Sequence, residues 1–141
     1  RQMCIRDRIC PRLSIKGTTA LTQHQQAGHH VALVSGTPEF LIKPLAHFLD
    51  VPNVLAAKLE SNENGYTGSV LYPYPYGEGK RWLLQAFAET HGVDLSQSYA
   101  YGDSPGDIQV LESVGHPLVV NPIRGMARIA RRHRWPIALW A

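Results

Sequence analysis

The chain has 141 residues, of which 44% are hydrophobic and 18% are charged, and its formal net charge at pH 7 is +3. This length and composition describe an ordinary soluble protein with room for one real hydrophobic core. No apolar run approaches the ~18 residues of a membrane span, and the N-terminus lacks the apolar region of a signal peptide, so we expect a cytoplasmic protein without a membrane span. The two cysteines, Cys4 and Cys10, fit neither a disulfide framework nor a usual zinc-binding pattern.

The N-terminal residues divide into an irregular stretch and a helix. Residues 1–8 show no periodicity and are similar to translated adapter sequence, so we predict that they are not native; an ordinary frayed terminus is the alternative. Residues 12–28 predict a helix, because they are helix-compatible and end at Gly28, which suits the position just after a helix.

A buried strand and a candidate anion site follow. Residues 31–34, Val-Ala-Leu-Val, are a continuous apolar run, which is typical of a strand buried on both faces. Ser35, Gly36 and Thr37 come directly after it, and a hydroxyl with free backbone amides at the end of such a strand forms a small anion site. The alternative is that Ser35 or Thr37 only caps the next helix, which residues 39–49 predict.

The middle of the chain predicts a hairpin. A third strand lies within residues 51–60, and the turn sequence at 62–65 connects a strand to its returning partner at 66–71. A loop with two prolines then leads to a helix over residues 79–91.

Lys80 lies in the first turn of that helix, where a cation is unfavourable for the helix dipole. A lysine that faces a phosphate group would show this placement, and a solvated surface lysine is the alternative. We expect the apolar side chains of this helix to point inward; they are Trp82, Leu83, Ala86 and Phe87.

Residues 98–115 predict a strand, a tight turn and a helix. Asp103 follows the short strand 98–101 and Gly102, so it lies at the carboxyl end of the strand, where ligands bind in open parallel sheets. Ser104 suits the cap of the next helix, with Asp107 at its third position. Two carboxylates here can hold a hard cation and orient a lysine; the alternative for Asp107 is a plain helix start.

A short strand at 117–122, a basic helix at 124–133 and an edge strand at 135–140 complete the chain. The alternation of strands and helices predicts an α/β fold with a mostly parallel sheet. In such a sheet Ser35, Lys80 and Asp103 can converge on one edge. A hydroxyl and a lysine that neutralise phosphoryl oxygens, with a carboxylate that holds Mg²⁺, favour phosphoryl transfer.

Three stretches in this order resemble motifs two, three and four of the haloacid dehalogenase superfamily. They are Val-Ala-Leu-Val-Ser35-Gly, Gly-Glu-Gly-Lys80 and Tyr-Gly-Asp103-Ser-Pro-Gly-Asp107. The similarity is closest to the phosphoserine-phosphatase-like branch, subfamily IB, and runs from about residue 12 to the end. It implies a Rossmann-like three-layer α/β/α core.

The resemblance also implies the organisation and the roles of residues. Residues 29–141 would be the C-terminal part of the core, and residues 9–28 the end of a cap or linker helix. The enzyme would be a Mg²⁺-dependent phosphatase that acts on a small-molecule phosphomonoester, without a nucleic-acid partner. By this resemblance Ser35 and Gly36 bind the phosphoryl group, Lys80 stabilises its charge, Asp103 binds Mg²⁺, and Asp107 holds Lys80 or assists at the metal.

The first motif of the superfamily, Asp-x-Asp-x-Thr, does not occur in the sequence. Its first aspartate forms the aspartyl phosphate and its second is the general acid and base. We therefore expect this chain to be the C-terminal part of a phosphatase, to lack the first strand and most of the helical cap, and to be inactive alone. Its aspartates are Asp7, Asp50, Asp94, Asp103 and Asp107.

Two alternatives stay open. Ser104 and Gly106 replace the glycine and asparagine that are typical of phosphoserine phosphatases, so the substrate can equally be another phosphomonoester. A different class of function is a non-catalytic α/β module whose basic C-terminal helix binds nucleic acid or anionic lipid. The arginines concerned are Arg124, Arg128, Arg131, Arg132 and Arg134.

Overall fold

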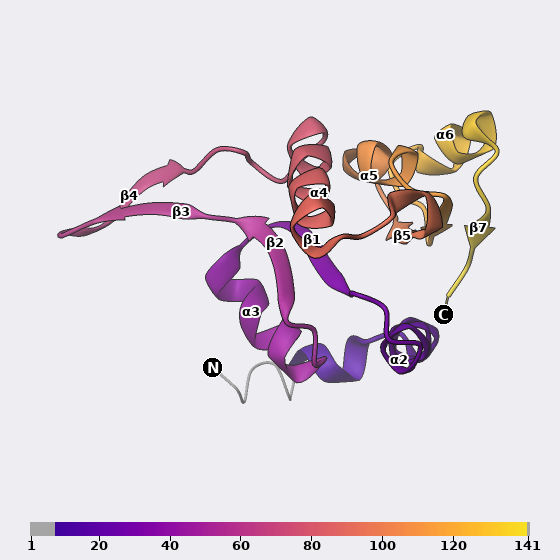
Figure 1. Ribbon diagram of the computed structural model, residues 1–141, viewed down its shortest axis with the longest axis horizontal. Helices are drawn as coiled ribbons and strands as arrows, with labels where there is room; N and C mark the ends of the chain where they lie inside the picture. The colour runs from indigo at the N-terminus through magenta and orange to yellow at the C-terminus, as the bar shows by residue number, and fades with distance from the viewer. Residues whose placement is uncertain (1–7, 141) are drawn as a thin grey trace. The chain divides into compact units, whose positions relative to one another are not determined.

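The computed structural model describes residues 8–140, which fall into two compact units (Figure 1). The first unit extends to Leu71 and includes Trp140, and the second extends from Tyr72 to Leu139. Apart from Arg8, the stretch predicted to be non-native lies outside the described residues, as does Cys4. No helix of the described part is both long and apolar enough to cross a membrane.

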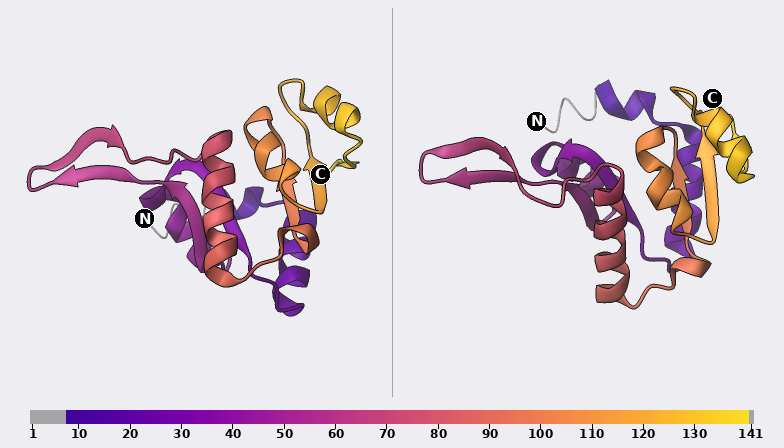
Figure 2. Two further views of the ribbon diagram at one scale, coloured as in Figure 1. Left: turned by 45° about the horizontal axis from the view of Figure 1, so that its top comes forward. Right: turned by 90° about the horizontal axis from the view of Figure 1, so that it is seen from above.

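The first unit contains a parallel strand pair with a helix between the two strands. Its elements are η2 (Cys10–Arg12), α2 (Ile15–Gln26), β1 (Ala32–Pro38), α3 (Glu39–Phe48), β2 (Asn53–Ala57), β3 (Leu59–Asn62) and β4 (Gly65–Val70). β1 and β2 are parallel, and α3 connects them, as in the crossover unit that the alternating pattern predicts. The predicted hairpin is confirmed as the antiparallel pair β3–β4, a ribbon of largely exposed residues (Figure 2).

Two details of β1 differ from the prediction. The strand does not stop at residue 34 but continues to Pro38, so Ser35 and Gly36 lie within it. Its residues are half-buried or exposed rather than buried on both faces, since β1 pairs only with β2 among the strands of residues 8–140. A strand that has one neighbour leaves its second edge uncovered.

The second unit is built around a parallel sheet in the order β5-β6-β7. Its elements are α4 (Glu78–His91), η3 (Leu95–Gln97), β5 (Tyr99–Gly102), η4 (Pro105–Asp107), α5 (Ile108–Glu112), β6 (His116–Val120), α6 (Met126–His133) and β7 (Ile137–Ala138). Both strand pairs of this sheet are parallel, which confirms the predicted α/β class and the edge strand near the C-terminus.

The core of the second unit lies between its sheet and its helices. Leu111 of α5, Val119 of β6 and Met126 of α6 are fully buried there, and Leu84 of α4 packs against the same cluster. Burial of these apolar side chains is the main favourable contribution to folding of this unit. The core therefore fixes α4 and α5; the candidate site lies in the first turn of α4 and in the residues that directly precede α5.

The expected inward face of α4 is wrong in part. Trp82 is 45% exposed and Ala86 is also exposed, whereas Gly79 and Ala88 are the buried positions. Trp82 instead packs on Tyr72, with ring centroids 5.4 Å apart. The helix approaches its surroundings through its smallest residues, because a Cβ atom on Gly79 would lie 1.7 Å from the carbonyl oxygen of Tyr74.

Candidate active site

The candidate site begins where β5 ends. Ala100 of this strand is buried, and the register pairs Tyr101 with Leu118 and Gly102 with Val119 of β6. A side chain at Gly102 is excluded, because its Cβ atom would lie 2.7 Å from the Cβ of Asp107. The chain thus turns sharply after Gly102 and places Asp103 at the carboxyl end of the strand, as predicted.

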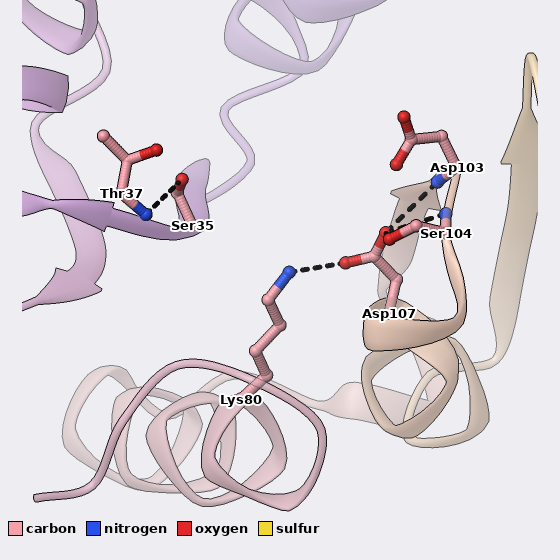
Figure 3. A network of polar contacts seen from close by, with 6 residues as sticks. All are labelled: Ser35, Thr37, Lys80, Asp103, Ser104 and Asp107. Carbon is pink, nitrogen blue, oxygen red and sulfur yellow. Dashed lines mark hydrogen bonds and ion pairs between the residues drawn. The ribbon is translucent and has the colours of Figure 1, made fainter. Parts of the chain in front are cut away.

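Asp107 is the centre of the polar network that Figure 3 shows. Its Oδ1 accepts a hydrogen bond from Lys80 Nζ at 2.5 Å. Its Oδ2 accepts from the backbone N–H of Asp103 at 3.2 Å, from the backbone N–H of Ser104 at 3.3 Å, and from the Ser104 hydroxyl at 3.2 Å. One carboxylate therefore binds the lysine of α4 and fixes the turn that follows β5.

Burial and neighbouring charge shift the pKa of the Asp107 carboxyl in opposite directions. The side chains of Lys80 and Asp107 are only 11% and 15% exposed. Burial by itself raises the pKa of the Asp107 carboxyl, but the hydrogen bond and charge of Lys80 and the amides of Asp103 and Ser104 outweigh it, so the pKa lies below its ordinary value. Asp107 is accordingly a carboxylate, and Lys80 is its cation partner.

Asp107 makes the contacts of a helix start and also holds a lysine, while its part in chemistry stays a prediction. Its Oδ2 completes the helix start after Ser104, where η4 begins with Pro105. Its Oδ1 holds Lys80, the contact that the resemblance implies. The ion pair also explains why a lysine is tolerated in the first turn of α4, since the carboxylate offsets the unfavourable interaction with the helix dipole.

Asp103 differs from Asp107 in its surroundings. It is exposed, and no hydrogen bond or ion pair of its carboxylate occurs among the described residues. A carboxylate oxygen of this kind suits a hard cation such as Mg²⁺, which is held in proteins by one or two carboxylates and several waters. No cluster of three or more acidic, histidine or cysteine side chains arranged to hold a metal occurs in residues 8–140, so the fit is that of one open ligand.

A second bridge, which the sequence pattern did not predict, joins α4 and α5. Arg81 Nη2 lies 2.6 Å from Glu112 Oε2, and Arg81 Nη1 lies 3.6 Å from Glu78 Oε1. Arg81 is the neighbour of Lys80, so the two cations of α4 are tied to two acidic residues beyond β5. The one signal of this bridge in the sequence is the pair of adjacent basic residues, Lys80 and Arg81, at the start of the helix.

Ser35 and Gly36 belong to the first unit. The hydroxyl of Ser35 accepts a hydrogen bond from the backbone N–H of Thr37 at 3.1 Å. Neither Ser35 nor Thr37 caps α3, whose N-cap is Pro38 without a side-chain hydrogen bond, so the capping alternative is wrong. The structure brings Lys80, Asp103 and Asp107 together in the second unit, while the convergence of Ser35 and Gly36 with them stays a prediction.

Comparison with known proteins gives a consistent picture. The sequence model of the haloacid dehalogenase-like hydrolase family matches residues 2–112. A probable phosphatase of Mycobacterium tuberculosis is 34% identical over 133 residues, which are 94% of this chain and 46% of the relative. A histidinol-phosphatase of Neisseria meningitidis is 31% identical over 133 residues, 92% of this chain and 60% of that protein. The chain thus spans about half the length of relatives it matches.

Solved structures agree on the fold. A Bordetella pertussis protein of unknown function has a TM-score of 0.86 and 30% identity, over 96% of this chain and 62% of that one. Other matching proteins, in sequence and in structure, are named phosphoserine phosphatases. These similarities confirm the predicted Rossmann-like α/β fold and the resemblance to the phosphoserine-phosphatase-like branch.

Proposed function

Because the chain belongs to the haloacid dehalogenase-like hydrolase family, we propose that it is part of a Mg²⁺-dependent phosphatase that hydrolyses a small-molecule phosphomonoester. The observation that supports this most directly is the Lys80–Asp107 pair beside the exposed Asp103. A held lysine, and a carboxylate that can hold a metal cation, would place positive charge at the end of a parallel strand, where it stabilises the negative charge on a transferring phosphoryl group.

Each residue has a distinct role in this proposal. Lys80 carries the positive charge that stabilises the phosphoryl oxygens, and Asp107 keeps its ammonium in one position. Asp103 would hold Mg²⁺, which when bound supplies further positive charge to the phosphoryl oxygens. The hydroxyl of Ser35 and the backbone amide of Gly36 would donate hydrogen bonds to the same oxygens.

The nucleophile is the part that these residues do not supply. The family reaction, as the resemblance implies it, proceeds through an aspartyl phosphate on an Asp-x-Asp motif, and the sequence contains no such pair. Asp103 cannot both hold the metal and attack in line, and the pairing of Asp107 with Lys80 leaves it no role as a proton donor. We therefore propose that this chain alone does not hydrolyse phosphomonoesters and needs a segment with the Asp pair.

The proposed substrate is defined only as a chemical class, the small-molecule phosphomonoesters. Relatives are named for histidinol phosphate and for phosphoserine, and both substrates are phosphomonoesters of small alcohols. Ser104 and Gly106 depart from the phosphoserine-phosphatase pattern, so another phosphomonoester fits equally well as the substrate. We propose only the phosphomonoester class, and the cytoplasm as its location stays a prediction.

The test compares this chain with a longer one. The purified chain is assayed with p-nitrophenyl phosphate and Mg²⁺, and the assay is repeated on a chain that includes the coding sequence upstream of residue 9. We expect hydrolysis only from the longer chain, and only while Asp103 is intact. Comparable, Asp103-dependent activity from the shorter chain would show that it needs no further segment.

A further inference from the structure

The position of Lys80 depends on how the start of α4 meets the turn after β5. A lysine side chain has a flexible stem of four carbons, so its ammonium stays on one carboxylate oxygen reliably only when the backbone of the lysine is fixed. Lys80 is the third residue of α4, and its partner Asp107 lies 27 positions further along the chain. Contacts between the loop before α4 and residues 104–107 therefore help to position the pair, in addition to the core and the Arg81–Glu112 bridge that also join α4 to α5.

Tyr76 makes the main contact of this kind. A Cβ atom built on Gly106 would lie 2.8 Å from Cε2 and 3.2 Å from Cδ2 of Tyr76, so the ring packs directly on the backbone of Gly106. Gly106 is buried, although the Tyr76 side chain itself is 64% exposed. The ring thus covers the glycine with one part and faces solvent with the rest.

The backbone contact between the loop before α4 and Gly106 is weaker than the contact of the Tyr76 ring. The backbone N–H of Gly77 donates to the carbonyl oxygen of Gly106 at 3.4 Å, which is long for a hydrogen bond. Gly77 has φ +54°, a conformation that favours glycine, and its carbonyl accepts the backbone N–H of Lys80 at 3.0 Å. The first turn of α4 is thereby hydrogen-bonded to Gly77, the residue that follows Tyr76.

We propose that Tyr76 is a positioning residue, whose ring on Gly106 holds the start of α4 against the turn after β5 and so keeps Lys80 on Asp107. The importance of this contact for catalysis rests on the proposed function, but the contact itself does not. Gly106 has no side chain, and this is what admits the ring.

The test measures how well Lys80 is protected, in the chain as it exists and without substrate. Acetylation of Lys80 by a small amine-reactive reagent is followed by mass spectrometry in the original chain and in Tyr76→Phe, Tyr76→Ala and Tyr66→Ala. Tyr76→Ala should accelerate acetylation of Lys80 roughly tenfold, because it opens a charge-assisted hydrogen bond. Tyr76→Phe should keep the original rate, since the ring and not the hydroxyl makes the contact.

Two controls separate positioning from loss of structure. Tyr66→Ala removes a tyrosine of β4 in the first unit that is 64% exposed, as Tyr76 is, and it should leave the rate at Lys80 unchanged. The amide spectrum of β5 and β6 reports whether the second unit stays folded; if Tyr76→Ala unfolds it, Tyr76→Leu replaces it in the comparison. Unchanged protection of Lys80 in a folded Tyr76→Ala or Tyr76→Leu chain would overturn the proposal, whatever the outcome of the phosphatase assay.

Discussion

Replacing Asp107 by asparagine should destabilise the second unit by about 2–4 kcal/mol, judged from the loss of a mostly buried ion pair. The side chains of the pair are 11% and 15% exposed, so the cost approaches but does not reach the ~3–5 kcal/mol of a fully buried pair that loses one partner. Asparagine keeps one oxygen for the amides of Asp103 and Ser104, and the predicted loss is therefore chiefly that of the lysine contact.

Native-state hydrogen exchange measures this loss in the correct unit. Amides of β5 and β6 report opening of the second unit, and amides of β1 and β2 provide an internal reference in the first. Exchange of the β5 and β6 amides should accelerate roughly 30-fold or more, since each 1.36 kcal/mol is a factor of ten. The matched control is Glu39→Gln, which breaks a pair with Lys43 whose side chains are more exposed, 29% for Glu39 and 60% for Lys43.

The effect of Asp107→Asn should also depend on pH. The folded-state pKa of Asp107 is lowered, so the stability from its pairing is complete above the ordinary carboxyl pKa and is lost as pH falls through the folded value. The difference between the original chain and the variant should therefore shrink below about pH 4. A variant no less stable than Glu39→Gln at pH 7, or a difference that grows in acid, would refute the role of the pair.

Three further predictions concern other parts of the chain. Magnesium titration followed by NMR should show weak binding that Asp103→Asn removes, and identical binding in both chains would exclude Asp103 as the ligand. Burial, and then the charge of His29, lower the pKa of His24, whose Nδ1 lies 2.8 Å from Nδ1 of His29. The unfolded chain therefore binds a proton at His24 more readily than the folded chain, and lowering the pH through the range in which histidine is protonated should destabilise the first unit. Slower exchange of the β1 and β2 amides in acid, after correction for intrinsic exchange rates, would argue against this. The arginines of α6 are exposed, and Arg131 and Arg132 lie in its last turn, where cations suit the helix dipole, so a labelled oligonucleotide should not bind at about 0.15 M salt. Salt-sensitive binding there would favour the nucleic-acid alternative.

The sequence predicted the elements well wherever local signals were strong. Local residue types signal three features: the turn at 62–65, the end of α2 before Gly28, and the helix start after Ser104. Each of them lies where it was expected. Asp103 could be placed at a strand end for the same reason, because a short strand followed by glycine fixes its position.

Contacts between distant residues were the part that the sequence could not supply. The apolar pattern of α4 pointed to Trp82 and Ala86, but packing is decided by Gly79 and Ala88, which allow close approach. The double role of Asp107 likewise depends on a lysine 27 positions away, which no local pattern reveals. The residue that completes the helix start and the residue that holds Lys80 are the same carboxylate here, and only the three-dimensional arrangement shows that the two contacts coincide.

The measurement that tests the proposed phosphatase most directly is the turnover of p-nitrophenyl phosphate by the longer chain with Lys80 replaced by alanine. Removing one preorganised charge from the transition state costs about 2.7–4 kcal/mol in comparable sites, so turnover should fall roughly 10²–10³-fold. Lys43→Ala, which removes a lysine whose side chain is 60% exposed, should leave turnover unchanged. Near-normal turnover of a folded Lys80→Ala enzyme would contradict the proposal, because Lys80 would then be only a partner of Asp107.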